Sequence, residues 1–329
     1  MKWIYKRIIN SVVAWVAAIS IAFIMVKVMP GNIINVLIIN YVVNYHVPYQ
    51  QAVQMVTALV GYPVNQPLWQ AYISYITNLL RGNFGRSINY DTPVSVLVAN
   101  TLPWTLLLVV LSLLVSVGLG IFVGLAMAYY RNKAHLVNGV KLGLSVLNAF
   151  PNFVLGVIFF YYIGYTYHLL PYEGAYSPGV VPGLNLNFIG SVLSHYILPV
   201  LTMSLTLFPG WAFSTMGTAT SVLKDDYVTA AKARGLPSRR ILFSYVAKNS
   251  ILPIYTSIPI SLAFLLAGAV WIESIFELPG MGYYLSVALG VRDYPLIMGY
   301  YFVIITALIL GNLFTDFTYS LVDPRAKVE

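Results

Sequence analysis

The chain contains no cysteine and few charged side chains. Its 329 residues include 18 Lys and Arg, 10 Asp and Glu, and four His. Without cysteine the chain has no disulfide, no thiol nucleophile and no thiolate metal ligand. The histidines are isolated from one another and from carboxylate clusters, so their spacing predicts neither a metal site nor a cofactor. They are His46, His135, His168 and His195.

The sequence also lacks the short motifs of common enzymes. It has no Gly-rich loop ending in Gly-Lys-Ser or Gly-Lys-Thr, no nucleophile elbow and no His-Glu-x-x-His pattern. The chain therefore cannot bind and hydrolyse ATP in the P-loop manner. We expect no catalytic residue in it.

What the chain has in abundance is apolar surface. Hydrophobic residues make up 59% of the sequence and charged residues 9%, with a mean hydropathy of +0.78. A soluble domain of this composition could not hydrate its surface, so the solvent is lipid and the fold class is an all-α polytopic membrane protein. The net charge of +8 is spread between the apolar runs, which indicates membrane topology and not nucleic-acid binding.

Six apolar runs reach the roughly 20 residues that a transmembrane helix needs. The first follows three basic residues but is longer than the apolar part of a signal peptide, so we expect it to be retained. The shorter run Ile33–Val43 predicts an interfacial or re-entrant segment, with a seventh span as the alternative. The predicted spans are Ile8–Met29, Leu102–Tyr129, Leu142–Tyr167, Phe188–Phe213, Ile251–Trp271 and Leu296–Leu321.

The distribution of basic residues predicts the orientation of these spans. With six spans both termini lie on one side, and that side carries 14 of the 18 Lys and Arg residues. The positive-inside rule then places both termini in the cytoplasm. The four exceptions are Lys27, Arg81, Arg86 and Arg292.

The segment between the first two spans is too long for a bare connection. It runs from about Pro30 to Asn100, and Leu68–Leu80 has apolar residues at helical spacing. We expect a helical cap on the external side. The predicted organisation is residues 1–29 for the N-terminus and first span, 30–100 for the external segment, and 101–329 for a five-span core that contains a cytoplasmic loop at 214–250.

A polar stretch from Lys224 to Lys248 has the start and stop signals of two helices that meet at a bend. Asp225 and Asp226 precede Lys232 and Arg234, the order that suits the helix dipole. Gly235 is placed to close the turn and Pro237 follows it. Ser238 is placed to cap a second helix.

The first of these helices has the character of a docking element. Tyr227, Ala230 and Ala231 share one helical face, where small side chains let a partner approach the backbone closely. The charged residues around them would orient that partner. The alternative is an ordinary solvated loop.

Few ionisable residues lie inside or beside the apolar runs. Asp316 follows Asn312 by four residues on one helix face. The pair indicates either a proton or cation relay or, as we favour, an inter-helix hydrogen bond, since no partner group lies at a similar depth. Glu273 and Glu277 follow the fifth span and either line a solute entrance or mark the membrane interface.

The polar stretch resembles the cytoplasmic loop shared by permease subunits of ABC importers. That pattern reads Glu-Ala-Ala, three residues, Gly, nine residues and Ile-x-Leu-Pro. Thr229 replaces the Glu, and Ala230, Ala231 and Gly235 match. Tyr245-Val-Ala-Lys248 falls where Ile-x-Leu-Pro is expected. The run Asp226-Tyr227-Val228 is similar to the first, or B-type, permease of dipeptide and oligopeptide importers.

Other stretches over most of the chain agree with that subgroup. They are Gln66-Pro67-Leu68-Trp69, Gly82-Asn-Phe-Gly85-Arg-Ser87, Asn100-Thr101-Leu102-Pro103, Pro151-Asn-Phe153, Leu198-Pro199, Glu273, Pro279-Gly280-Met281-Gly282, Arg292-Asp293-Tyr294-Pro295, Asn312, Asp316 and Asp323-Pro324-Arg325.

The resemblance implies a half-channel in the plasma membrane. Its partners would be a second, related permease, two cytoplasmic ATPase subunits that hydrolyse ATP, and an extracytoplasmic solute-binding protein. Contact with an ATPase would involve Asp225, Asp226, Tyr227, Thr229, Ala230, Ala231, Arg234 and Gly235. Candidates for the external mouth or pathway are Glu273, Glu277, Arg292 and Asp293.

Two other functional classes remain open from the sequence. An ion-coupled secondary transporter or channel would be expected to show paired ionisable groups at mid-membrane or inverted repeats, and neither pattern is evident. A membrane scaffold or insertase would not explain the agreement in loops on both faces. Peptides are the default solute of the resembled subgroup, with oligosaccharides or nickel as alternatives.

Overall fold

The computed structural model describes residues 2–28, 33–60 and 67–322 and is helical throughout that part of the chain. The only β pairing among those residues is an isolated bridge between Arg86 and Pro93. The all-α prediction is confirmed. The chain divides into two compact units, which are described separately: residues 1–105 with 279–313, and residues 106–278 with 314–329.

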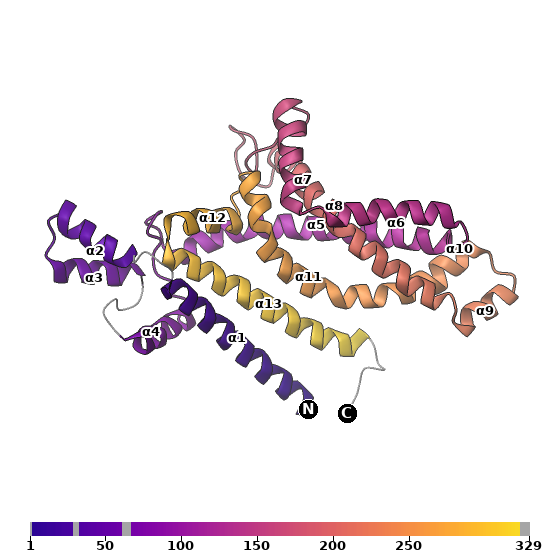
Figure 1. Ribbon diagram of the computed structural model, residues 1–329, viewed down its shortest axis with the longest axis horizontal. Helices are drawn as coiled ribbons and strands as arrows, with labels where there is room; N and C mark the ends of the chain where they lie inside the picture. The colour runs from indigo at the N-terminus through magenta and orange to yellow at the C-terminus, as the bar shows by residue number, and fades with distance from the viewer. Residues whose placement is uncertain (1, 29–32, 61–66, 323–329) are drawn as a thin grey trace. The chain divides into compact units, whose positions relative to one another are not determined.

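Within the described residues, four helices are long and apolar enough to cross a membrane without a break. They are α1 (Lys2–Val28), α5 (Val94–Tyr129), α8 (Leu186–Val222) and α13 (Tyr294–Val322) (Figure 1). Two further helix pairs reach that length only across a bend, so the described residues hold between four and six candidate spans. Each of the six predicted spans overlaps one of these elements.

The predicted span Leu142–Tyr167 is not one helix. Helix α6 (Ala134–Ala149) is separated from α7 (Asn152–Ile158) and a π-helical segment η1 (Phe159–Thr166) by a 90° bend. Phe150 is extended, with φ −74° and ψ 125°, because it precedes Pro151 and a residue before proline avoids the helical region. The predicted span is therefore a bent pair of helices, which reaches the length of a span only across this bend.

The predicted span Ile251–Trp271 lies within α11 (Lys248–Ile275), which bends by 47° between Ser257–Ala267 and Ala269–Ile275. Apolar composition predicted the position of this helix, which has 28 residues and extends beyond both ends of the predicted span, but it gave no sign of the bend.

The unit made of residues 1–105 and 279–313 contains the segment between the first two spans. Its short helices are α2 (Ile33–Asn44), α3 (Tyr49–Val60), α4 (Leu68–Leu80) and α12 (Met281–Val291). Helices α2 and α3 pack against each other (Figure 1). At 12 residues, α2 is about 18 Å long, too short for a seventh span. The predicted helix Leu68–Leu80 is confirmed with the same bounds as α4.

Polar and aromatic contacts join α1 to other helices of this unit. The Trp15 indole N–H donates to the Thr306 hydroxyl at 2.9 Å, and the Trp15 ring packs edge-on against Phe302. Phe23 stacks on Tyr75 with ring centroids 5.2 Å apart. Such contacts stabilise helix pairs in lipid, where apolar burial alone gives no preference for protein over solvent.

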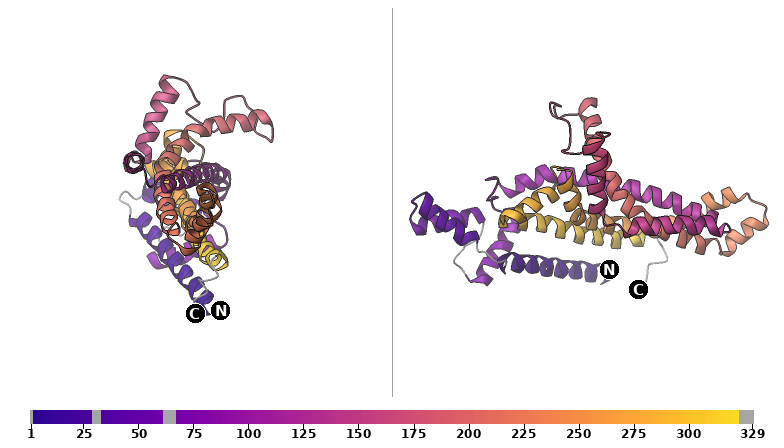
Figure 2. Two further views of the ribbon diagram at one scale, coloured as in Figure 1. Left: turned by 90° about the vertical axis from the view of Figure 1, so that its right-hand side faces the viewer. Right: turned by 45° about the horizontal axis from the view of Figure 1, so that its top comes forward.

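The unit made of residues 106–278 and 314–329 is built around α8. Helices α6, α7 and α11 pack against it, as two views show (Figures 1 and 2). Helix α5 approaches α8 at Gly120 and Gly124, where small residues allow close helix contact. A Cβ atom on Gly124 would lie 2.6 Å from the backbone oxygen of Ala212. The Ser204 hydroxyl donates across the same interface to the Ser112 carbonyl at 3.1 Å.

We expect Gly124→Ala to lower the stability of this unit by about 1–3 kcal/mol, because the added methyl group meets backbone that cannot move away cheaply. The matched control is Gly118→Ala on the same helix, where a Cβ atom has nothing within 4 Å. Its expected effect is neutral or stabilising, since alanine favours helix over glycine. Thermal unfolding in detergent compares the two, and equal midpoints would contradict the close α5–α8 contact.

Candidate functional site

The polar stretch folds as the two predicted helices. Helix α9 (Asp226–Ala233) ends at Gly235, whose φ of +74° is the left-handed conformation that glycine adopts without strain. The Gly235 N–H donates to the Lys232 carbonyl at 2.9 Å and the Leu236 N–H to the Ala231 carbonyl at 3.3 Å. This pair of hydrogen bonds is a Schellman motif, so the predicted stop at Gly235 is confirmed.

The second helix begins one residue earlier than predicted. Helix α10 (Ser238–Ile241) has Pro237 as its N-cap, and no side chain caps it. The Pro237 carbonyl accepts from the Ile241 N–H at 3.1 Å, which makes Ser238 the first residue of the helix. The prediction that Ser238 is the cap was therefore wrong. From Ile241 the chain continues through a π-helical segment η2 (Leu242–Ala247) into α11.

The inner face of α9 is packed against its own chain. Val228 and Ala231 are completely buried in one hydrophobic cluster. Their neighbours there come from the ends of α5 and α8 and from α10 and η2, namely Leu125, Ala128, Ala219, Ile241, Leu242, Val246 and Ala247. Ala231 thus points inward while Tyr227 and Ala230 are exposed, so the three do not form the single exposed face that helical spacing suggested.

Tyr227 attaches α9 to the segment that leads into α11. Its hydroxyl accepts a hydrogen bond from the Asn249 side-chain amide at 2.6 Å, and its ring stacks on Tyr245 with centroids 6.5 Å apart. Asn249 lies in the first turn of α11. Tyr227 therefore connects α9 to the start of α11, a role within this chain that the sequence did not reveal.

The outer face of α9 is free of contacts with the cluster beneath it. Asp226, Thr229, Ala230 and Ala233 are all exposed and lie opposite Val228 and Ala231 at helical spacing. Asp225 is the N-cap and is exposed, without a side-chain cap hydrogen bond. Arg234 is also exposed, and its Nε donates to the Ala230 carbonyl at 3.4 Å. A partner can approach this small-residue face directly.

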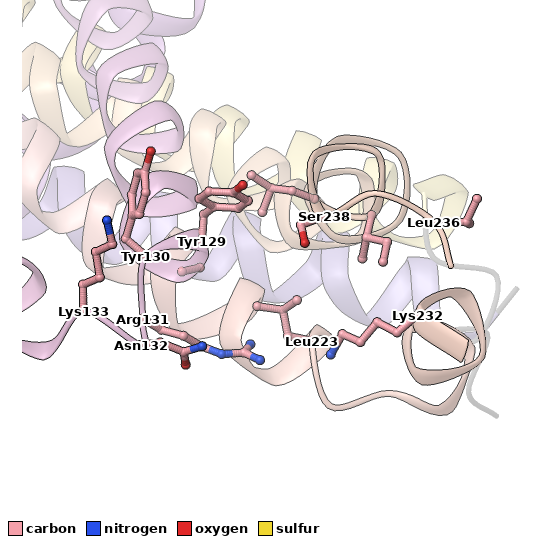
Figure 3. A pocket seen from close by; sticks show the side chains of 12 residues that line it. Tyr129, Tyr130, Arg131, Asn132, Lys133, Leu223, Lys232, Leu236 and Ser238 are labelled. Atoms are coloured by element: carbon pink, nitrogen blue, oxygen red, sulfur yellow. The ribbon is translucent and has the colours of Figure 1, made fainter. Parts of the chain in front are cut away.

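A pocket of about 650 Å³ lies beside α9 (Figure 3). It is lined by the turn between α5 and α6 and by α9 and α10. Its described lining carries three cationic side chains and no carboxylate: Arg131, Lys133 and Lys232. Figure 3 shows the Arg131 and Lys232 head groups pointing into the space beside Leu223. Lys133 lies over the Tyr130 ring, 5.4 Å from its centroid.

The sequence indicated Arg131 and Lys133 only as markers of membrane orientation. Their proximity to α9 depends on the return of the chain through α6 and α8, which no local pattern encodes. The arrangement gives this end of the unit a positively charged hollow next to a small-residue helix, and it suits an acidic partner surface.

Two of the predicted external or pathway residues, Glu273 and Glu277, lie at the end of α11. The Glu273 side chain is completely buried. Glu277 has a φ of +50°, and the Leu278 N–H donates to the Glu273 carbonyl at 2.9 Å, which closes the helix in the way that Gly235 closes α9. Burial removes Glu273 from the surface of this unit.

Asp293 links two segments of the other unit. Its carboxylate is completely buried and accepts hydrogen bonds from the Ser87 hydroxyl, the Asn89 N–H at 3.0 Å and the Leu296 N–H at 3.2 Å. The last bond caps the first turn of α13. The preceding Arg292 is exposed and ends α12 in the left-handed conformation, with φ +60°.

The polar pair predicted in the last span lies on α13. Asn312 is partly buried there, and the side chain of Asp316 lies outside the described residues. Among the residues that the structure describes, no group of three or more His, Asp and Glu side chains could hold a metal ion. His195 is buried, and its Nδ1 lies 2.7 Å from the Ser191 carbonyl oxygen.

We expect Asp293→Ala to destabilise its unit by about 1–3 kcal/mol, because three donors lose a buried charged acceptor. Asp293→Asn keeps one side-chain oxygen as an acceptor and should recover part of that loss. The measurement is thermal unfolding of both variants in the same detergent. Wild-type stability of Asp293→Ala would show that these hydrogen bonds do not hold the loop to α13.

Long apolar helices, with the short polar helix α9 packed on the ends of α5 and α8, are the arrangement of a polytopic membrane protein. Residues 120–328 match the family described as "Binding-protein-dependent transport system inner membrane component". The match covers more than half of the chain, and the chain belongs to this family. It is a multi-pass inner membrane protein, as the resemblance in its polar stretch predicted.

The chain is similar along most of its length to named permeases. It is 32% identical over 266 residues, 80% of this chain and 82% of the relative, to the probable peptide ABC transporter permease protein y4tP of Sinorhizobium fredii. It is 29% identical over 333 residues, covering all of both chains, to the dipeptide transport system permease protein DppB of Lactococcus lactis. It is 28% identical over 327 residues, 99% of both chains, to the oligopeptide transport system permease protein AppB of Bacillus subtilis.

Proposed function

We propose that this chain is a permease subunit of an ATP-driven importer of short peptides. The observation that carries the proposal is the correspondence over the full chain length with permeases named for dipeptide and oligopeptide transport. The helical architecture, with four to six candidate spans, supports it. The chain supplies the passage through the membrane and is itself not an enzyme.

The importer needs components that this chain lacks. A second, related permease would complete the passage, as the resemblance to ABC importer permeases implies. Two cytoplasmic ATPase subunits would supply the energy of ATP hydrolysis, and a solute-binding protein outside the cell would deliver the peptide. The family description, which names a binding-protein-dependent system, supports the last of these partners.

The exposed face of α9 is the proposed contact with an ATPase. Thr229, Ala230 and Ala233 let a groove of the ATPase approach the backbone, while the buried Val228 and Ala231 hold α9 rigidly to α5 and α8. The positively charged pocket beside α9 adds a site for an acidic side chain of the same partner. Movement of the ATPases would then displace the ends of both long helices together.

We expect Ala230→Trp to reduce ATP-dependent peptide uptake at least tenfold, because the indole would hold the ATPase groove away from α9. The variant should still insert and fold, since Ala230 is exposed and touches nothing in the cluster below it. Uptake is measured in proteoliposomes that contain all subunits. Ser244→Trp controls for added bulk at an exposed position of the same segment, outside α9. Normal uptake by Ala230→Trp at equal incorporation would refute the contact.

The proposed topology has both termini, α9 and the basic pocket in the cytoplasm, and the helices α2 to α4 in an external cap. The excess of Lys and Arg on the terminal side supports it. We expect alkaline phosphatase, which is active only outside the cytoplasm, to be inactive when fused after Lys133 and active when fused after Gly183. The reverse pattern would contradict the orientation.

A further inference from the structure

A second hollow, of about 410 Å³, opens on the flank of α8 in the unit that carries α9. Four helices contribute to it, and the polar side chains among its lining are all uncharged. The lining residues are Leu113 of α5, Asn148 of α6, Thr206, Leu207, Gly210, Trp211 and Ser214 of α8, and Ser261, Phe264 and Leu265 of α11.

The hollow lies near the middle of the membrane-spanning region of this unit. Leu113, Asn148, Gly210 and Ser261 are between about 18 and 24 Å from the ends of their helices nearest to α9, at 1.5 Å per residue. The hydrocarbon core is about 30 Å thick, so all four helices contribute to the hollow at a similar, central depth.

The composition of the hollow differs from the other exposed surface of the same helices. Large apolar side chains that suit lipid cover much of that surface, including Leu114 and Phe122 on α5 and Leu142 on α6. In the hollow an amide and three hydroxyl groups come together, and Asn148 and Ser214 are exposed. Polar side chains at this depth face protein or water far more often than lipid.

The glycines of α8 leave open space on the side of the helix that lines the hollow. A Cβ atom on Gly210 would meet nothing within 4 Å, and the same is true of Gly217, two turns further along the helix. Gly210, Ser214 and Gly217 therefore form an open, small-residue stripe that leads from the hollow toward the end of α8 that packs on α9.

We propose that this hollow is the part of the solute passage contributed by this chain at mid-membrane, and that it contacts the solute through uncharged hydrogen-bonding groups. This inference rests on the proposed function. Asn148, Thr206, Ser214 and Ser261 can exchange hydrogen bonds with peptide amide groups. Trp211 and Phe264 can cover apolar parts of the solute.

The absence of a charged side chain from the described lining gives the passage a specific property. A fixed charge in a narrow site attracts ions of one sign and repels the other. A neutral lining makes no such selection, so this hollow should contact solutes of either charge equally well. Selection by charge would then belong to the solute-binding protein.

The lack of native cysteine allows a direct test, because single cysteines can be introduced into the natural chain. Ser214→Cys and Ser261→Cys are nearly isosteric changes in the hollow, and Leu114→Cys lies on the exposed apolar surface of α5. The complete importer in liposomes is treated with two small thiol reagents that need a hydrated thiol. One carries a trimethylammonium group and the other a sulfonate group.

We expect both reagents to label Ser214→Cys and Ser261→Cys at least tenfold faster than Leu114→Cys. Each rate is divided by the rate of the same reagent with a small free thiol in solution, because the negative thiolate itself favours the cationic reagent. The normalised rates for the cationic and anionic reagents should agree within about threefold. Labelling no faster than that of Leu114→Cys would overturn the passage. A normalised preference of more than tenfold for one reagent would overturn the uncharged lining.

The same preparation separates this inference from the proposed function. The cysteine-free parent is assayed for ATP-dependent uptake of a radiolabelled tripeptide. Uptake by the parent together with slow labelling in the hollow would refute the passage and leave the importer function intact. Fast labelling without ATP-dependent uptake would support a hydrated passage and refute the proposed function.

Discussion

The packing of α9 onto its own chain is the constraint on which the other features depend. A helix of eight residues is not stable alone in water, so its conformation comes from what it packs against. Val228 and Ala231 provide that contact by burial between the ends of α5 and α8, and Tyr227 adds a hydrogen bond to the start of α11. Because the inner face of α9 is buried against its own chain, only the outer face of α9 is available to another protein.

Helices α5 and α8 connect the mid-membrane hollow to the hydrophobic cluster beneath α9. Helix α5 contributes Leu113 to the mid-membrane hollow and Leu125 to the cluster beneath α9, and α8 contributes Gly210 and Ala219 in the same way. Both helices are continuous between these points, and Gly120 and Gly124 hold α5 close to α8. A displacement of α9 would therefore reach the hollow through packed helices, without a separate signalling element. Energy from ATP hydrolysis outside the chain could thus change the access of a site inside it.

Local chemistry made much of this fold predictable from the sequence. Gly235 ends α9 because only a residue that tolerates positive φ closes a Schellman motif without strain, and Leu68–Leu80 was recognisable from its apolar spacing. The steric effect of Pro151 on Phe150 was also local, but its outcome, a 90° bend inside an apolar run, was not evident from composition. Hydropathy measures the length of an apolar segment and does not distinguish a straight helix from a broken one.

The features that sequence reasoning missed depend on contacts between distant segments. The buried face of α9 is the one that packs against the ends of α5 and α8. Helical spacing within α9 alone could therefore not show that Ala231 points inward. Arg131 and Lys232 line the same pocket only because the turn between α5 and α6 lies beside α9. Asn148 and Ser261 line the same hollow only because α6 and α11 both pack against α8. Asp293 was recognised as a candidate, but its hydrogen bonds to Ser87 and Asn89 give it a role in holding the loop to α13.

The most direct test of the central claim is to purify the tagged chain from its native membranes in mild detergent and to identify the attached proteins by mass spectrometry. We expect a second permease, P-loop ATPases and a solute-binding protein to accompany the chain, and the ATPase subunits to be lost when Ala230 is replaced by Trp. The contradicting result is a chain that purifies alone and moves peptide across liposome membranes without ATP.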